Sequence, residues 1–202
     1  MVANIVAKRR WCIVTIISTP SETEATGRVA ELYAEDIADL GFVAGHTRVL
    51  SLNAEAYDAW EHLISAIAGP MDKRRYELVT LAAALGAKSR HCRLAHGRKS
   101  LRYFDEAELV RIASNYREAG LSPAEVAMMD FAEQVSVDPS VMTDADSQKL
   151  RDAGFSDREI VDITLAAAAR NYYSRAVQAL AIEVDETPGI SDELRDALVA
   201  GI

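Results

Sequence analysis

The sequence predicts an all-α protein, and three observations support this. Half of the 202 residues are hydrophobic, while the chain has only 10 glycines and 5 prolines to interrupt long helices. Helix-capping patterns recur along the chain. The one good strand candidate is Cys12–Ile17, and no alternation of strands and helices follows it.

Capping residues predict the helices of the first half of the chain. In Ser21-Glu-Thr-Glu24 an acid follows a serine by three residues, which is the capping-box pattern at a helix start. Gly41 is expected to stop that helix, and residues 40–45 are expected to form a loop. The helices expected from such caps run over about residues 22–39 (Ser21), 54–68 (Asn53), 73–88 (Asp72), 90–102 (Ser89) and 106–119 (Asp105).

Two pairs of segments repeat one another. Residues 117–126 match residues 151–160, and each contains a helix end, a glycine and a Ser-x-x-Glu capping box. A longer echo links Leu81–Ala84 with Leu165–Ala168, but no Cys or His follows the second copy. We interpret this as an internal duplication in which one copy kept its reactive groups. Chance similarity between two alanine-rich helices is the alternative.

The chain is expected to form an extended N-terminal segment (1–20), a single all-α domain (21–185) and a short C-terminal helix or tail (186–202). Basic residues precede a short apolar run near the start, but that run lacks a cleavage site of the signal-peptide kind. No stretch approaches transmembrane length. Two cysteines make no disulfide framework, which favours a reducing compartment, so a cytoplasmic location is expected.

Charge is unevenly distributed. A net charge of −9 argues against nucleic acids and anionic membranes as partners. Basic residues nevertheless cluster in one stretch, where Glu77 is the only acid: Lys73, Arg74, Arg75, Lys88, Arg90, Arg93, Arg98, Lys99 and Arg102. This cluster predicts either a solvated helix face or a positive field around a reactive site.

Cys92 is the first candidate reactive residue. If Ser89 is an N-cap, Cys92 is the third residue of the new helix, where free N–H groups and the helix dipole favour a thiolate. Arg90 and Arg93 add positive charge. His96 follows one turn later on the same face, within reach of the sulfur, and such a pair can shuttle a proton. The alternative is a buried, inert cysteine.

Glu77 is the second candidate. It shares its helix face with two leucines and an alanine, so its carboxylate emerges from an apolar stripe. Desolvation there would raise the pKa of Glu77 and suit it to proton transfer. The alternative is an ion pair with Lys73 or Arg74, one turn earlier.

Metal binding is the third possibility. His91, Cys92 and His96 could be ligands, but the chain lacks the paired spacing of zinc sites. No metal and no cofactor are therefore expected.

The spacing of these residues resembles a known family. AhpD-like alkylhydroperoxidases, in the carboxymuconolactone decarboxylase superfamily, share a pattern of one glutamate, two cysteines and one histidine. Eleven residues separate the glutamate from the first cysteine, two separate the cysteines, and three separate the second cysteine from the histidine. Glu77, Cys92 and His96 are in register with it, and His91 matches a histidine often found between the two cysteines. Segments at 121–125, 131–133, 154–157 and 171–173 also resemble the longer peroxidase-related members, so the resemblance covers about residues 24–185.

The resemblance implies an AhpD-like helical bundle and a thiol-dependent peroxidase. It implies Cys92 as the thiol that attacks a peroxide, with Glu77, His91 and His96 relaying protons. The first cysteine of the family pattern is Ser89 here, which can cap the helix but cannot form the disulfide. The resemblance thus implies an external thiol as reductant, and it also implies a homo-oligomer formed through helical interfaces.

Three hypotheses follow for the function. The first is a one-cysteine peroxidase that reduces hydrogen peroxide or an organic hydroperoxide. The second is a non-redox enzyme, such as a lactone decarboxylase, that uses His96 and Glu77 as acid and base while arginines hold an anionic substrate. The third is a binding or scaffold protein that has lost the chemistry. The presence of Ser89 separates the first hypothesis from the standard two-cysteine scheme.

Overall fold

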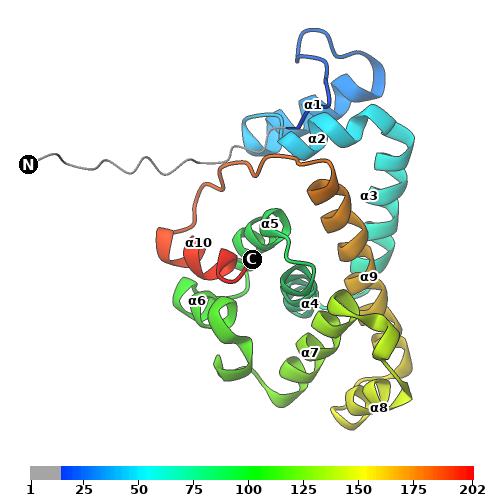
Figure 1. The fold of residues 1–202 in the computed structure, drawn as a ribbon, viewed down its shortest axis with the longest axis vertical. Coiled ribbons are helices and arrows are strands. Elements are labelled where there is room, and N and C mark those ends of the chain that lie inside the picture. Colours follow the sequence, from blue (N-terminus) through cyan, green and yellow to red (C-terminus); the bar gives the residue numbers. More distant parts are fainter. Residues whose placement is uncertain (1–14) are drawn as a thin grey trace, which may run out of the picture.

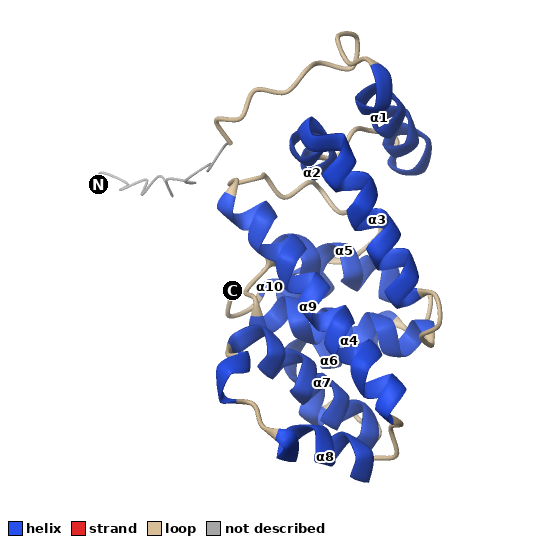
Figure 2. Ribbon diagram, turned by 90° about the vertical axis from the view of Figure 1, so that its right-hand side faces the viewer, coloured by secondary structure: helices blue, strands red, loops and turns tan. Residues whose placement is uncertain are grey.

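The computed structural model describes residues 15–202, and within them it contains helices and no strand (Figure 2). The prediction of an all-α protein is confirmed. Residues 15–17 of the predicted strand form none, and Cys12 to Val14 lie outside the described residues. The helices are α1 (Gly27–Leu40), α2 (Gly45–Leu50), α3 (Ala54–Ala68), α4 (Lys73–Gly86), α5 (Arg90–Ser100), α6 (Glu106–Asn115), α7 (Pro123–Val137), α8 (Asp144–Asp152), α9 (Asp157–Ala179) and α10 (Asp192–Val199).

Helix α4 lies at the centre of the bundle, with α5, α7 and α9 packed around it (Figure 1). Every residue from Tyr76 to Ala84 is buried, because this helix has no polar face and must be covered on all sides. Gly86 lets α7 approach closely. A Cβ atom at this position would lie 2.6 Å from the backbone carbonyl oxygen of Glu133, so alanine is excluded unless the backbone shifts.

Four of the five predicted caps of the first half are confirmed. Asn53, Asp72, Ser89 and Asp105 each accept a backbone N–H group in the first turn of α3, α4, α5 and α6. Lys88 has a left-handed φ of 53°, which lets the chain turn sharply between α4 and α5. Helix α5 therefore folds back against α4, and this places Cys92 next to the buried core.

The predicted caps of the repeat are also confirmed. Ser122 opens α7 and Ser156 opens α9 with complete capping boxes, and the preceding Gly120 and Gly154 have left-handed φ values of 84° and 95°. Helix α9 then runs unbroken for 23 residues, whereas the matching segment of the first copy breaks between α4 and α5. Helices α4 and α9 pack against each other.

The start of α1 was predicted wrongly. Ser21 and Glu24 do form the expected contact, with the Ser21 N–H donating to the carboxylate at 3.0 Å, but they close only an isolated turn. The helix begins at Gly27, five residues later than expected. Gly27 has a φ of 56°, and a left-handed residue cannot continue a right-handed helix from the earlier turn.

The first three helices and the last helix pack at the periphery of the bundle. Helices α1, α2 and α3 gather at one end, and α3 lies along α9 (Figures 1 and 2). After α9 the chain passes back beside α2, where the Gly45 N–H donates to the carboxylate of Asp185 at 3.1 Å. Helix α10 then packs on α5 and α6. Across residues 15–202, no helix is both long enough and apolar enough to span a membrane.

Candidate active site

The sulfur of Cys92 lies where α5 begins and α9 passes. Cys92 is the third residue of α5, and its N–H donates to the Ser89 hydroxyl oxygen at 3.4 Å, as predicted. Its side chain is 1% exposed. The sulfur is contacted from α9, by the Ser174 hydroxyl at 3.2 Å and by Nη1 of Arg170 at 3.8 Å. Cys12 lies outside the described residues.

Arg170 supplies a buried positive charge beside this sulfur. Burial by itself lowers the pKa of a guanidinium, yet the pKa of Arg170 is raised, because Cys92 and Tyr76 stabilise its charged form. The guanidinium therefore stays charged within reach of the thiol. A fixed cation at this distance stabilises negative charge that develops on an atom reacting with the sulfur.

Glu77 and His96 form a buried pair. Nδ1 of His96 and Oε2 of Glu77 are 2.7 Å apart, which requires one proton between them. Burial raises the pKa of Glu77 to about 7, and burial also lowers the pKa of His96 well below its usual range. The expected apolar setting of Glu77 is confirmed. The alternative ion pair is wrong, because Arg74 contacts Glu125 at 3.2 Å and the Lys73 ammonium donates to the carbonyl oxygens of Ala68 and Gly69.

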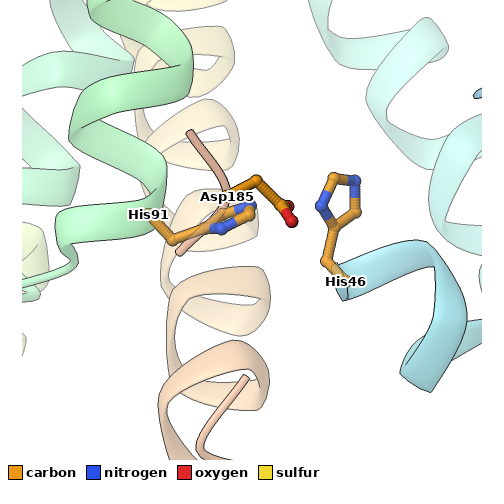
Figure 3. Close-up of side chains that lie close together, drawn as sticks. All are labelled: His46, His91 and Asp185. Carbon is orange, nitrogen blue, oxygen red and sulfur yellow. The ribbon is translucent and has the colours of Figure 1, made fainter. Parts of the chain in front are cut away.

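His91 points into a separate cluster. Its ring lies edge-on to the ring of His46, with centroids 4.8 Å apart, and both side chains converge with the carboxylate of Asp185 (Figure 3). Burial lowers the pKa of His91 to about 3 and the pKa of His46 to about 4. Both imidazoles are therefore neutral at neutral pH, and each has one ring nitrogen that can accept a hydrogen bond or bind a metal.

Cys92, Arg170, His46, His91 and Asp185 line one cavity of about 620 Å³, whereas Glu77 and His96 lie behind its lining residues. Aromatic side chains of Tyr57, Trp60 and Tyr173 form part of its wall, and the Trp60 and Tyr173 rings stack with centroids 5.1 Å apart. The reactive and charged residues that line it are Asp36, Asp39, His46, Glu61, His91, Cys92, Arg98, Lys99, Arg102, Arg170, Asp185 and Glu186. The cavity therefore offers a small molecule a site whose wall contains the almost fully buried Cys92 and carries both signs of charge.

Three members of the predicted basic cluster reach the cavity. Arg98, Lys99 and Arg102 line it, but acidic side chains line it as well, so its charge is mixed. Arg93 does not line it, although it is adjacent to Cys92 in sequence. It is 1% exposed, and it donates to the carbonyl oxygens of Leu198 at 2.9 Å and Ala113 at 2.8 Å. Arg93 therefore holds helix ends together and leaves the field at the sulfur to other residues.

Sequence reasoning missed four residues of this region: His46, Arg170, Ser174 and Asp185. A signal existed for two of them. Arg170 and Ser174 are four residues apart and directly follow the alanine-rich segment of α9, and a charged residue on a buried face is unusual enough to mark a site. His46 and Asp185 gave no such signal, since one lies in a short unpredicted helix and the other in a loop.

The fold and the site together define a class: an all-α bundle with a buried cysteine in the first turn of one helix and a buried glutamate–histidine pair. Neither a family model nor a curated protein matches the chain. The solved structures that it matches have the AhpD-like fold, so the resemblance seen in the sequence is confirmed at the level of the fold.

Three solved structures illustrate this fold. A peroxidase-related protein with an alkylhydroperoxidase AhpD core from Ralstonia eutropha has 23% identity and a TM-score of 0.72, over 93% of this chain and 97% of that one. A peroxidase-related protein from a Silicibacter species has 23% identity and a TM-score of 0.76, over 87% and 95%. A cysteine-to-alanine variant of the debrominase Bmp8, in complex with 2,3,4-tribromopyrrole, has 16% identity and a TM-score of 0.72, over 91% and 96%.

Proposed function

We propose that this protein is a thiol-dependent peroxidase that reduces hydrogen peroxide or an organic hydroperoxide through Cys92. The observation that carries the proposal is the environment of the sulfur. It lies at a helix N-terminus, 3.8 Å from the Arg170 guanidinium, in the wall of a cavity that contains His91. Such surroundings are typical of reactive cysteines, whereas inert buried cysteines lie among apolar groups alone.

The reaction is a two-electron oxidation of the thiol. The Cys92 thiolate attacks one peroxide oxygen, the O–O bond breaks, and the other oxygen leaves as an alkoxide or hydroxide that takes up a proton. Cys92 becomes a sulfenic acid. Arg170 stabilises the charge that moves from sulfur to the leaving oxygen, and the buried Glu77–His96 pair exchanges the protons.

An external thiol completes the cycle. A first thiol condenses with the sulfenic acid, which gives a mixed disulfide and water, and a second thiol releases Cys92 as a thiol. Ser89 cannot replace the first external thiol, because its hydroxyl forms no disulfide. Its Oγ instead accepts the Cys92 N–H, which keeps the first turn of α5 in place.

The direct test is trapping of the sulfenic acid. Peroxide followed by dimedone is expected to add one dimedone to Cys92 in the wild type and in Cys12→Ser, and none in Cys92→Ser, as measured by mass spectrometry of peptides. An unmodified Cys92 in the folded wild type would contradict the proposal. Glu77 and His96 would then be better explained as the acid and base of a non-redox enzyme.

Ser89→Cys is expected to restore a two-cysteine scheme. Ser89 is fully buried, and its side chain already faces the first turn of α5 that contains Cys92. A thiol there should capture the sulfenic acid and form a disulfide between positions 89 and 92, with loss of one water. Non-reducing mass spectrometry should then find two fewer hydrogens in that peptide. Ser100→Cys, also buried but near the far end of α5, is the matched control and should stay reduced at that position.

A second candidate is removal of a halogen from a small halogenated ring. A variant of the debrominase of similar fold was solved in complex with 2,3,4-tribromopyrrole. In this protein the stacked rings of Trp60 and Tyr173 line the same cavity as Cys92, and a flat aromatic ring can pack against them. The Cys92 thiolate would attack the halogen, the carbon–halogen bond would break, and the ring carbon would take up a proton. An external thiol would then attack the Cys92 sulfur, which releases halide and leaves a mixed disulfide, and a second thiol would regenerate Cys92. Incubation of wild type and Cys92→Ser with this pyrrole and a dithiol, with bromide release as the readout, tests it.

A further inference from the structure

His46, His91 and Asp185 form a group of metal-ligand type that the proposed reaction does not require. They come from three separate parts of the chain: α2, α5 and the loop after α9 (Figure 3). One ligand atom from each lies within 4.8 Å of the other two. A tetrahedral zinc ion with bonds of about 2.0–2.1 Å spaces its ligands by roughly 3.3 Å, so small rotations of the three side chains close the site.

The surroundings of the group point to a missing ligand. Nδ1 of His46 is buried from solvent and has no hydrogen-bond partner within residues 15–202. A buried nitrogen without a hydrogen-bond partner is unfavourable, so a group outside residues 15–202 is expected to satisfy it. Asp185 is already oriented, since the Gly45 N–H donates to both of its carboxylate oxygens at 3.2 and 3.1 Å. Backbone contacts of this kind orient the ligands of metal sites.

Charge does not exclude a cation. Four cationic side chains in the same cavity disfavour one, but four carboxylates line it besides Asp185: the cations are Arg98, Lys99, Arg102 and Arg170, and the carboxylates are Asp36, Asp39, Glu61 and Glu186. The ligand types restrict the choice of ion. Two imidazoles and one carboxylate suit zinc and similar transition metals, whereas magnesium and calcium prefer sites made of oxygen alone.

We infer that His46, His91 and Asp185 bind one divalent transition-metal ion of the zinc type. Three protein ligands leave at least one coordination position for water or another small ligand, which is the arrangement of catalytic rather than structural zinc sites. Because His91 and Cys92 are neighbours and line the same cavity, an ion held there also obstructs access to the thiol. This inference concerns binding and does not depend on the peroxidase proposal.

Binding is tested with untagged protein and Zn²⁺ by isothermal titration calorimetry. We expect one ion per chain in the wild type. In both His46→Ala and Asp185→Asn the affinity for Zn²⁺ should fall by more than about 10- to 100-fold, which is the loss usually caused by changing residues that contact a metal ligand without binding the metal. Asp185→Asn keeps an oxygen for the Gly45 N–H, so it should leave the fold intact. His62→Ala is the control, because His62 is exposed on α3 and lies outside the group. Magnesium should not bind at this site.

A second measurement distinguishes this site from direct binding of zinc to the thiol. Zn²⁺ should slow the alkylation of Cys92 by iodoacetamide in the wild type and in His62→Ala, but not in Asp185→Asn. Protection that persists in Asp185→Asn would show that the ion is held by Cys92 itself, and the inference would be wrong. It would also be wrong if Zn²⁺ did not bind the wild type, or if His62→Ala alone abolished binding.

Discussion

Glu77→Gln is expected to slow the formation of the Cys92 sulfenic acid by on the order of 100-fold, since it removes a proton-transfer group and keeps the shape of the side chain. The pH profile should change as well. The Glu77 carboxyl, with a pKa of about 7, accepts a proton only when ionised, so the rate in the wild type should rise with pH through about 7. This limb should disappear in the variant. The rate of sulfenic acid formation can be measured at several pH values by stopped-flow mixing, or by quenching the reaction and trapping the acid with dimedone.

Glu61→Gln is the matched control for this prediction. Glu61 lines the cavity and, like Glu77, has a pKa raised by burial, but His96 is paired with Glu77 instead. Its replacement should leave the limb at pH 7 in place. If Glu77→Gln and Glu61→Gln behaved alike, the Glu77–His96 pair would have no part in the proton transfer, and its 2.7 Å contact would serve stability alone.

Arg93→Met is expected to lower the free energy of unfolding by about 3 kcal/mol or more. We expect this to be the largest loss of stability among the substitutions proposed for this protein. Leu198 lies in the last turn of α10 and Ala113 in the last turn of α6, where carbonyl oxygens have no partner within their own helix. Arg93 donates to both and brings positive charge to two negative helix ends. Methionine preserves the apolar stem but leaves both carbonyls buried and unpaired.

Denaturant unfolding, followed by circular dichroism, measures this loss. Arg90→Met is the control, since Arg90 lies on the same helix but is exposed and makes only a 3.4 Å contact with the carbonyl oxygen of Ile202. Its replacement should change the free energy of unfolding by less than about 0.5 kcal/mol. Equal effects at the two positions would mean that the carbonyl contacts of Arg93 contribute little.

The sequence by itself determined the fold class and most helix starts. Caps such as Ser89 and Asp72 act within four residues of the chain, so their outcome is local and readable. For the same reason the position of Cys92 in the first turn of α5 could be predicted, as could the burial of Glu77 within an apolar stripe. The start of α1 could not, because the backbone conformation of Gly27 overrides the capping pattern at Ser21.

Only the tertiary structure decided which side chains meet at the site. The Glu77–His96 contact joins two helices across a sharp turn, and the partners of the Cys92 sulfur come from α9, about 80 residues later in the chain. The His46–His91–Asp185 group likewise joins α2, α5 and a loop. Periodicity and caps report on neighbours along a helix, whereas these contacts depend on how α4, α5 and α9 pack, and no local pattern encodes that packing. The same packing placed Arg93 against two helix ends, although its place in sequence suggested a role beside the sulfur.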